Sequence, residues 1–160
     1  MKILALDQAS KTTGYAIFEN GELLTYNKFT FEDSDMGIRL MKIRNKVREI
    51  IEENDIKEVI MEDIQLQEDA KNNVVTFKVL AEVFGVIHEL TTEMNIPWSA
   101  VSSSTWRHTL GIKGVKRAER KLLAQDYVEK HYSVRPTEDE CDAICIGTYK
   151  FKNNSPIDWS

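Results

Sequence analysis

The sequence of 160 residues has little cysteine, proline or glycine, and it has no long apolar run. It contains two cysteines, three prolines and seven glycines, and it shows no internal repeat, low-complexity tract or linker. No stretch approaches the roughly 20 apolar residues that span a bilayer. The single lysine before the first strand pattern differs from the start of a signal peptide. We therefore expect a cytoplasmic chain without a membrane partner.

The two cysteines, Cys141 and Cys145, lie four residues apart in a helical pattern. Helix geometry rarely permits a disulfide at this spacing, and free buried thiols are usual in a reducing compartment. A metal site would need further histidine or cysteine ligands, and the sequence places none beside them. We expect both thiols to be free and buried.

Charge is unevenly distributed along the chain. The formal net charge is −5 at pH 7, with 42% hydrophobic and 29% charged residues, as in an ordinary soluble domain. Basic side chains nevertheless gather in two clusters, Lys113, Lys116, Arg117, Arg120 and Lys121 in the first and Arg39, Lys42, Arg44, Lys46 and Arg48 in the second. Electrostatic footprints are local, so the acidic total does not exclude a nucleic-acid partner.

The two basic clusters lead to different expectations. The cluster at 113–121 lies near the start of an expected helix, where backbone N–H groups also favour phosphate. It is the better candidate for a DNA contact, and a solvated helix face is the alternative. We expect the cluster at 39–48 to form the solvent-exposed surface of another helix.

Apolar patterning predicts an α/β domain. Short buried strands are expected at residues 2–7, 57–63 and 96–102, and residues 14–31 read as two strands joined at the hairpin signal Asn20-Gly21. Helical periodicity is expected at residues 35–54, 70–94, around Trp106, and at 116–131 and 138–151. This order predicts a mixed five-stranded sheet, the first three strands antiparallel, flanked by helices. We expect a single domain over residues 1–152 and a short C-terminal tail at 153–160.

The segment 70–94 is apolar around most of its expected helical circumference, which predicts burial on more than one side. Two arrangements would satisfy this pattern. The helix could lie within the core of one chain, or it could form a symmetric seam between two copies.

Four acidic residues occupy positions where burial alone does not favour a carboxylate. Asp7 ends the first strand, Glu62 ends the fourth, and Asp139 and Asp142 share one face of the last helix. Ligands of open α/β sheets bind at the carboxyl ends of the strands. If the last helix packs there, the four carboxylates converge and require a cation.

Oxygen ligands of this kind suit Mg²⁺ or Mn²⁺. Two ions about 4 Å apart would clamp the attacking and leaving oxygens of phosphodiester hydrolysis. Some of these acids, taken singly, also fit a simpler structural role. Glu62 and Asp63 could form a solvated strand end, and residues 137–140 could be an acidic first helical turn.

Three motifs in this order resemble the RuvC-type Holliday junction resolvases of the ribonuclease H-like superfamily. They are Asp7 followed by Gly14, the strand "VIMED", and "DECDAICIG" with its Asp-x-x-Asp-Ala pattern. The segments "AKNN" and "GIKGVKRAERK" are also similar, and the resemblance extends over about residues 2–150. The shorter, phage-encoded branch of the family is the most similar, which would place the protein in a bacterial or phage-infected host cell.

The resemblance implies roles for individual residues. Asp7, Glu62, Asp139 and Asp142 would be the catalytic carboxylates and would bind Mg²⁺, or Mn²⁺ in its place, with two ions in each active site. Arg107 would contact DNA near the scissile phosphate, and the cluster at 113–121 would bind phosphates of the DNA backbone. The protein would be a homodimer that resolves four-way junctions.

The sequence departs from the family pattern at two places. The usual Asp-Pro-Gly turn is here Asp7-Gln8-Ala9, and because alanine adopts positive φ less readily than glycine, we expect a turn of different shape. Gln65 stands where bacterial members often carry an aromatic side chain that inserts at the junction. Cleavage-sequence preference and junction opening therefore stay open.

Other functions fit parts of the pattern. A broader branched-DNA nuclease or an RNA–DNA hybrid ribonuclease of the same fold would use the same carboxylates. An actin-like nucleotide-binding domain also places an acid after its first strand, but it normally needs two such domains around a cleft. A non-catalytic DNA-binding protein would not need all four acids.

Overall fold

The computed structural model describes residues 1–65 and 73–154. Residues 70–72 of the expected long helix, with most of the "AKNN" motif, and residues 155–160 of the expected tail lie outside this part of the chain. The described elements lie close to the expected positions. Five strands form one sheet, β1 Lys2–Asp7, β2 Thr12–Glu19, β3 Glu22–Thr30, β4 Ile56–Glu62 and β5 Trp98–Val101.

The sheet has the strand order β3-β2-β1-β4-β5. β1 and β2 are antiparallel, as are β2 and β3, whereas β4 is parallel to β1 and β5 is parallel to β4. Asn20 and Gly21 join β2 to β3 with φ angles of 51° and 85°, the backbone that a two-residue primed turn requires. The predicted mixed sheet with an antiparallel first half is therefore confirmed.

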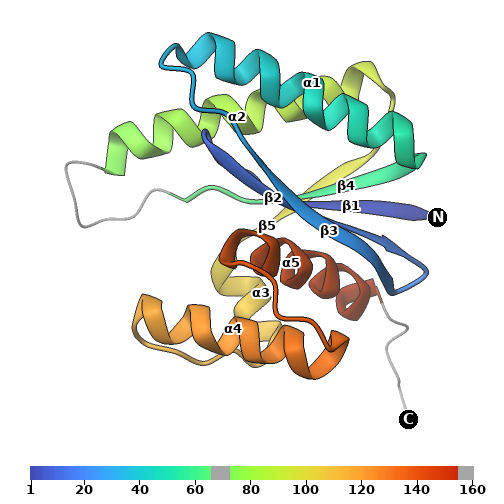
Figure 1. The fold of residues 1–160 in the computed structure, drawn as a ribbon, viewed down its shortest axis with the longest axis vertical. Helices are drawn as coiled ribbons and strands as arrows, with labels where there is room; N and C mark the ends of the chain where they lie inside the picture. The colour runs from blue at the N-terminus through green and yellow to red at the C-terminus, as the bar shows by residue number, and fades with distance from the viewer. Residues whose placement is uncertain (66–72, 155–160) are drawn as a thin grey trace.

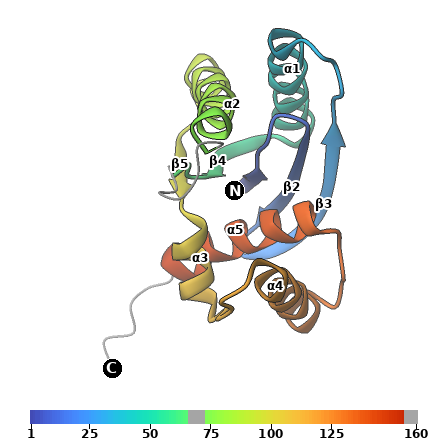
Figure 2. The same cartoon turned by 90° about the vertical axis from the view of Figure 1, so that its left-hand side faces the viewer.

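Helices cover both faces of the sheet (Figures 1 and 2). α1 (Met36–Asn54) and α2 (Asn73–Glu93) lie on one face, and α3 (Ser103–Leu110), α4 (Arg117–Tyr132) and α5 (Glu138–Asn154) lie on the other. Each face has its own apolar core. Leu4, Ile17 and Val47 belong to the core under α1 and α2, whereas Phe18 and Ile144 belong to the core under α5.

α2 is buried along a single stripe. Val83, Ile87 and Leu90 are fully buried in the core that α2 shares with α1, but Val74 and Val75 are 48% and 66% exposed. The expectation of burial on more than one side is thus not met within one chain. Apolar side chains of the first turns of α2 remain accessible, which leaves the expected seam between two copies as a proposal.

The basic side chains of α1 are paired with carboxylates and partly buried. Arg44 and Arg48 both bind Glu93 of α2, and Lys42 binds Asp33 at 2.9 Å. Arg39 donates to the carbonyl oxygen of Ser10 at 3.1 Å, which ties the start of α1 to the turn after β1. The basic surface of α1 is less exposed to solvent than expected, and carboxylates neutralise most of its positive charge.

Two expectations about chemistry and location can be compared with the structure. Cys141 and Cys145 are both free and buried, as expected. Within residues 1–65 and 73–154, no helix combines the length and apolar character needed to cross a membrane.

Candidate active site

Two of the predicted carboxylates are brought together by strand pairing. β1 and β4 run parallel with Leu6 opposite Met61, so that Asp7 and Glu62 both follow at the same edge of the sheet. This edge is the carboxyl end of both strands, where ligands of α/β sheets bind. The strand register therefore accounts for the proximity of Asp7 and Glu62.

The other two carboxylates reach this edge because α5 packs closely on β2. Gly14 of β2 lies opposite Asp7 in the antiparallel ladder. A Cβ atom added at Gly14 would lie 2.1 Å from the carbonyl oxygen of Asp139, so only glycine admits the first turn of α5 here. Asp142, one turn further along α5, is only 6% exposed.

The pKa values of the four carboxylates reflect their burial and their mutual repulsion. Burial raises the pKa of Asp7 well above its ordinary value, and Glu62, Asp142 and Asp139 raise it further in that order. Burial is likewise the main cause of the raised pKa values of Glu62, Asp142 and Asp139. The four acids are partly or fully buried at one edge of the sheet, and each has a raised pKa. The raised values indicate that the positive charge near these acids is too small to balance their negative charge.

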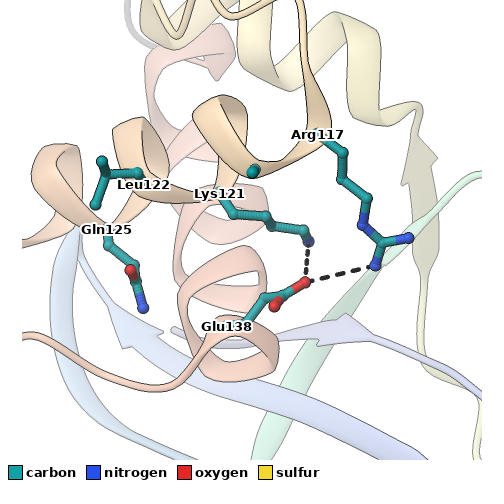
Figure 3. A pocket seen from close by; sticks show the side chains of 6 residues that line it. Arg117, Lys121, Leu122, Gln125 and Glu138 are labelled. Atoms are coloured by element: carbon teal, nitrogen blue, oxygen red, sulfur yellow. Dashed lines mark ion pairs between the residues drawn. The ribbon is translucent and has the colours of Figure 1, made fainter.

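The nearest positive charge is Lys121 of α4. Its Nζ lies 2.5 Å from Oδ2 of Asp142 and 3.1 Å from Oε1 of Glu138. Arg117 lies 3.6 Å from the same Glu138 oxygen. Figure 3 shows the ion pairs of Lys121 and Arg117 with Glu138. Arg117, Lys121 and Glu138 line an open hollow of about 690 Å³ between α4 and the start of α5, together with Leu122 and Gln125.

The donor set suits a hard divalent cation, because carboxylate oxygens are the ligands that Mg²⁺ and Mn²⁺ prefer. Asp7, Glu62, Asp139 and Asp142 could supply these oxygens. In the described part of the chain, however, no three acidic, histidine or cysteine side chains are already gathered as a metal cluster. Lys121 binds Asp142 directly, so this carboxylate interacts with an ammonium group instead.

Gln8 and Trp106 are site residues that the sequence analysis did not single out. The Gln8 side chain donates to the carbonyl oxygen of Glu62 at 2.6 Å and accepts from its N–H at 3.1 Å. Trp106 Nε1 donates to Oε1 of Glu62 at 3.2 Å. Together they fix both the backbone and the carboxylate of Glu62.

The turn Asp7-Gln8-Ala9, which replaces the usual Asp-Pro-Gly, forms without any residue at positive φ. Among the described non-glycine residues, positive φ occurs only at Asn20, Asp55, Asn95 and Ser133, so Ala9 needs none. The turn is closed by Thr13, whose Oγ1 accepts from the N–H of Ala9 and donates to its carbonyl oxygen, both at 3.2 Å. Gln8 itself is buried and bonds to the backbone of Glu62 at the end of β4.

We predict that Gln8→Ala lowers the free energy of unfolding by about 1–3 kcal/mol, because the two backbone groups of Glu62 lose their partners. Chemical denaturation measures this change. Gln65→Ala is the matched control, since Gln65 is exposed and lines the same cavity of about 150 Å³ beside Gln8 and Glu62. The control should change stability by about 0.5 kcal/mol at most; equal effects would contradict a positioning role for Gln8.

The predicted DNA-binding residues lie on the same side of the sheet as α5. Lys113, Lys116 and Arg117 are exposed. Arg107 is partly buried and donates to Oγ of Ser103 at 3.2 Å. Burial and Arg120 lower the pKa of Arg107, while Glu62 and Asp142 raise it, so this guanidinium lies within electrostatic reach of the carboxylates.

Arg120 and Lys121 are less accessible than the rest of the cluster. Both are partly buried, and Nε of Arg120 has no hydrogen-bond partner within the described residues. Lys121 binds acids of α5 rather than facing outward. The structure therefore separates an exposed part of the basic cluster from a partly buried part, of which Lys121 adjoins the carboxylates.

The strand order and the helices on both faces of the sheet match the ribonuclease H-like fold of solved RuvC structures. By sequence, the chain belongs to the family described as DUF3882, Lactococcus phage M3 protein, whose model matches residues 1–151. A search of curated proteins finds no sequence that matches.

Solved structures share the fold over nearly the whole chain. RuvC of T. thermophilus, in a complex with a Holliday junction substrate, has a TM-score of 0.70 and 15% identity, covering 95% of this chain and 93% of its own. The Fowlpox virus resolvase, in a complex with Holliday junction DNA, has a TM-score of 0.67 and 14% identity, covering 98% and 100%. The yeast mitochondrial Holliday junction resolvase Ydc2 has a TM-score of 0.55 and 14% identity, covering 94% and 78%.

Proposed function

We propose that the protein is a divalent-metal-dependent endonuclease that resolves four-way DNA junctions. The observation that carries this proposal is the convergence of Asp7, Glu62, Asp139 and Asp142 at one edge of a RuvC-type sheet. The fold is shared with resolvases whose structures include junction DNA, which supports branched DNA as the substrate class.

The four carboxylates would hold Mg²⁺, or Mn²⁺ in its place, as two ions. Such ions would supply the electrostatic stabilisation of the attacking and leaving oxygens during phosphodiester hydrolysis. The chain's own residues position these ligands. Gln8 and Trp106 hold Glu62, and the close contact at Gly14 holds the start of α5, which carries Asp139 and Asp142, on β2 beside Asp7.

DNA would bind across the carboxylates from the side of α3 and α4. Lys113, Lys116 and Arg117 are exposed there and would contact phosphates, while Arg107 lies beside the acids and would contact DNA near the scissile bond. Arg120 and Lys121 would join them from the first turns of α4. These contacts would be independent of base sequence, as phosphate contacts are.

Symmetric resolution of a junction needs two active sites, and we propose that two chains supply them. The accessible apolar side chains at the start of α2, Val74 and Val75, support a seam between copies at this helix. Light scattering of the purified chain tests this part of the proposal. A strictly monomeric chain at the concentrations that support cleavage would contradict it.

A cleavage assay tests the proposed activity. A synthetic four-way junction, a replication-fork mimic, linear duplex DNA and an RNA–DNA hybrid are compared with Mg²⁺ or Mn²⁺. We expect paired cuts in the junction and little cleavage of linear duplex. Equal cleavage of fork and junction would favour a broader branched-DNA nuclease, and preferential cleavage of the hybrid would favour a ribonuclease.

We predict that Lys116→Ala combined with Arg117→Ala weakens binding to DNA regardless of its sequence. Each lost phosphate contact reduces the slope of log affinity against log salt by about one, so the double variant should lose about two. Fluorescence anisotropy over a range of salt concentrations measures this slope. Lys42→Ala with Lys46→Ala removes the same charge from α1 on the opposite face and should leave the slope unchanged.

A further inference from the structure

We propose that Lys121 is a built-in cation that binds the carboxylates in the absence of metal and must leave when a divalent ion binds. This inference rests on the proposed function, because it concerns the metal site of the nuclease. It adds a regulatory coupling, in which metal binding releases a positive charge for DNA.

The contacts of Lys121 are those of a counter-ion. Its Nζ lies 2.5 Å from Asp142 and 3.1 Å from Glu138. The side chain of Asp142 is only 9% exposed, whereas that of Lys121 is 29% exposed. A buried carboxylate without a partner is strongly destabilising. Lys121 therefore stabilises the metal-free protein by supplying the charge that Asp142 lacks.

Lys121 and a divalent ion cannot both bind Asp142 closely. Both would use the same carboxylate oxygens, and their positive charges would repel each other strongly at a separation of about 4 Å in a partly buried site. The binding of metal must therefore include the loss of the contact between Lys121 and Asp142. This loss weakens the apparent affinity for metal.

The structure provides a place for the displaced ammonium group. Lys121 comes from α4 and borders the open hollow that Arg117 and Glu138 also line (Figure 3). A lysine side chain is a flexible stem, so Nζ can turn away from Asp142 while the backbone of α4 stays in place. There it would add to the positive charge of Arg117 and would be available to a phosphate.

The experiment measures Mn²⁺ affinity by calorimetry without DNA, so that catalysis plays no part. Lys121→Met should bind Mn²⁺ about tenfold more tightly than the unaltered chain, because no ammonium group has to be displaced. Arg117→Met is the matched control. Arg117 loses the same unit charge near Glu138, but its side chain is 80% exposed and its ion pair is with Glu138 at 3.6 Å.

The control should change Mn²⁺ affinity by less than about twofold, because an exposed charge is screened by solvent. Equal tightening in the two variants would reduce the effect to overall charge and overturn the proposal. Unchanged or weaker binding by Lys121→Met would also overturn it. Lys121→Arg, which keeps a cation at this position, should bind Mn²⁺ much more weakly than Lys121→Met.

Two further measurements keep the result unambiguous. If Lys121→Met unfolds without metal, circular dichroism can follow its refolding by Mn²⁺, and the midpoint supplies the same comparison with Arg117→Met.

Asp7→Asn distinguishes a failure of the proposed metal site from a failure of the proposed role of Lys121. If this variant also leaves Mn²⁺ binding unchanged, the proposed metal site itself is wrong; if it abolishes binding, only the role of Lys121 is at issue.

Discussion

Asp7→Asn should abolish metal-dependent cleavage of a four-way junction while leaving junction binding intact or stronger. Asp7 is buried near the other three carboxylates, and its pKa is raised by burial and by these three acidic neighbours. Asparagine keeps the size of the side chain but removes the charge that a divalent cation needs. A rate loss of about a thousandfold or more corresponds to about 4 kcal/mol of transition-state stabilisation.

The same substitution should stabilise the metal-free protein. A buried carboxylate beside Glu62 and Asp142 costs free energy when no metal ion is bound, and asparagine removes this repulsion. Each kcal/mol relieved should raise the melting temperature by about 2–4 °C in a chain of this size. Thermal unfolding in the presence of a chelator measures the shift.

Asp63→Asn is the matched control for both measurements. Asp63 is adjacent to Glu62 but exposed, and its Oδ1 accepts from the N–H of Ile64, a bond that asparagine can keep. This control should cleave and melt as the unaltered chain does. Substantial residual cleavage by Asp7→Asn, with the control unaffected, would remove Asp7 from the catalytic set.

Gly14→Ala should lower both the stability of the protein and its cleavage of DNA. The added Cβ would meet the carbonyl oxygen and carbon of Asp139 at 2.1 and 2.3 Å, and these are backbone atoms that cannot rotate away. Either β2 or the start of α5 must move. Overpacking of this kind typically costs about 1–3 kcal/mol, and chemical denaturation measures the cost.

Cleavage should fall as well, because the displaced turn carries Asp139 and lies one turn before Asp142. A misplacement of about 1 Å at a catalytic site can reduce the rate about a hundredfold. Gly85→Ala is the control, since a Cβ at Gly85 of α2 meets no atom within 4 Å. It should raise stability by up to about 1 kcal/mol through better helix propensity. Wild-type stability and cleavage in Gly14→Ala would show that α5 tolerates the shift.

The sequence was sufficient to predict the architecture because its signals are local. Alternating or continuous apolar runs indicated the strands, and Asn20-Gly21 indicated the hairpin. Asp7 and Glu62 were evident at the ends of two expected strands. The parallel pairing of β1 with β4 accounts for their proximity. Asp139 and Asp142 followed from helical spacing, once α5 was assumed to pack on the sheet.

Other features depend on contacts between distant residues, which periodicity does not reveal. Gln8 bonds to Glu62 across 54 positions of sequence, and Trp106 bonds to Glu62 across 44. The binding of Lys121 to Asp142 depends on how α4 lies beside α5. The apolar character of α2 is evident in the sequence. Within the described chain, however, no helix or strand covers the accessible apolar side chains at the start of α2.

The placement of α5 also determines when the four carboxylates of the proposed active site are complete during synthesis of the chain. A ribosome-bound chain that has emerged only as far as α4 contains Asp7 and Glu62 but neither acid of α5. In such a chain no helix yet covers the sheet at Gly14. Since half of the carboxylates arrive with the last helix, nascent and prematurely terminated chains would lack a complete site for the proposed nuclease activity.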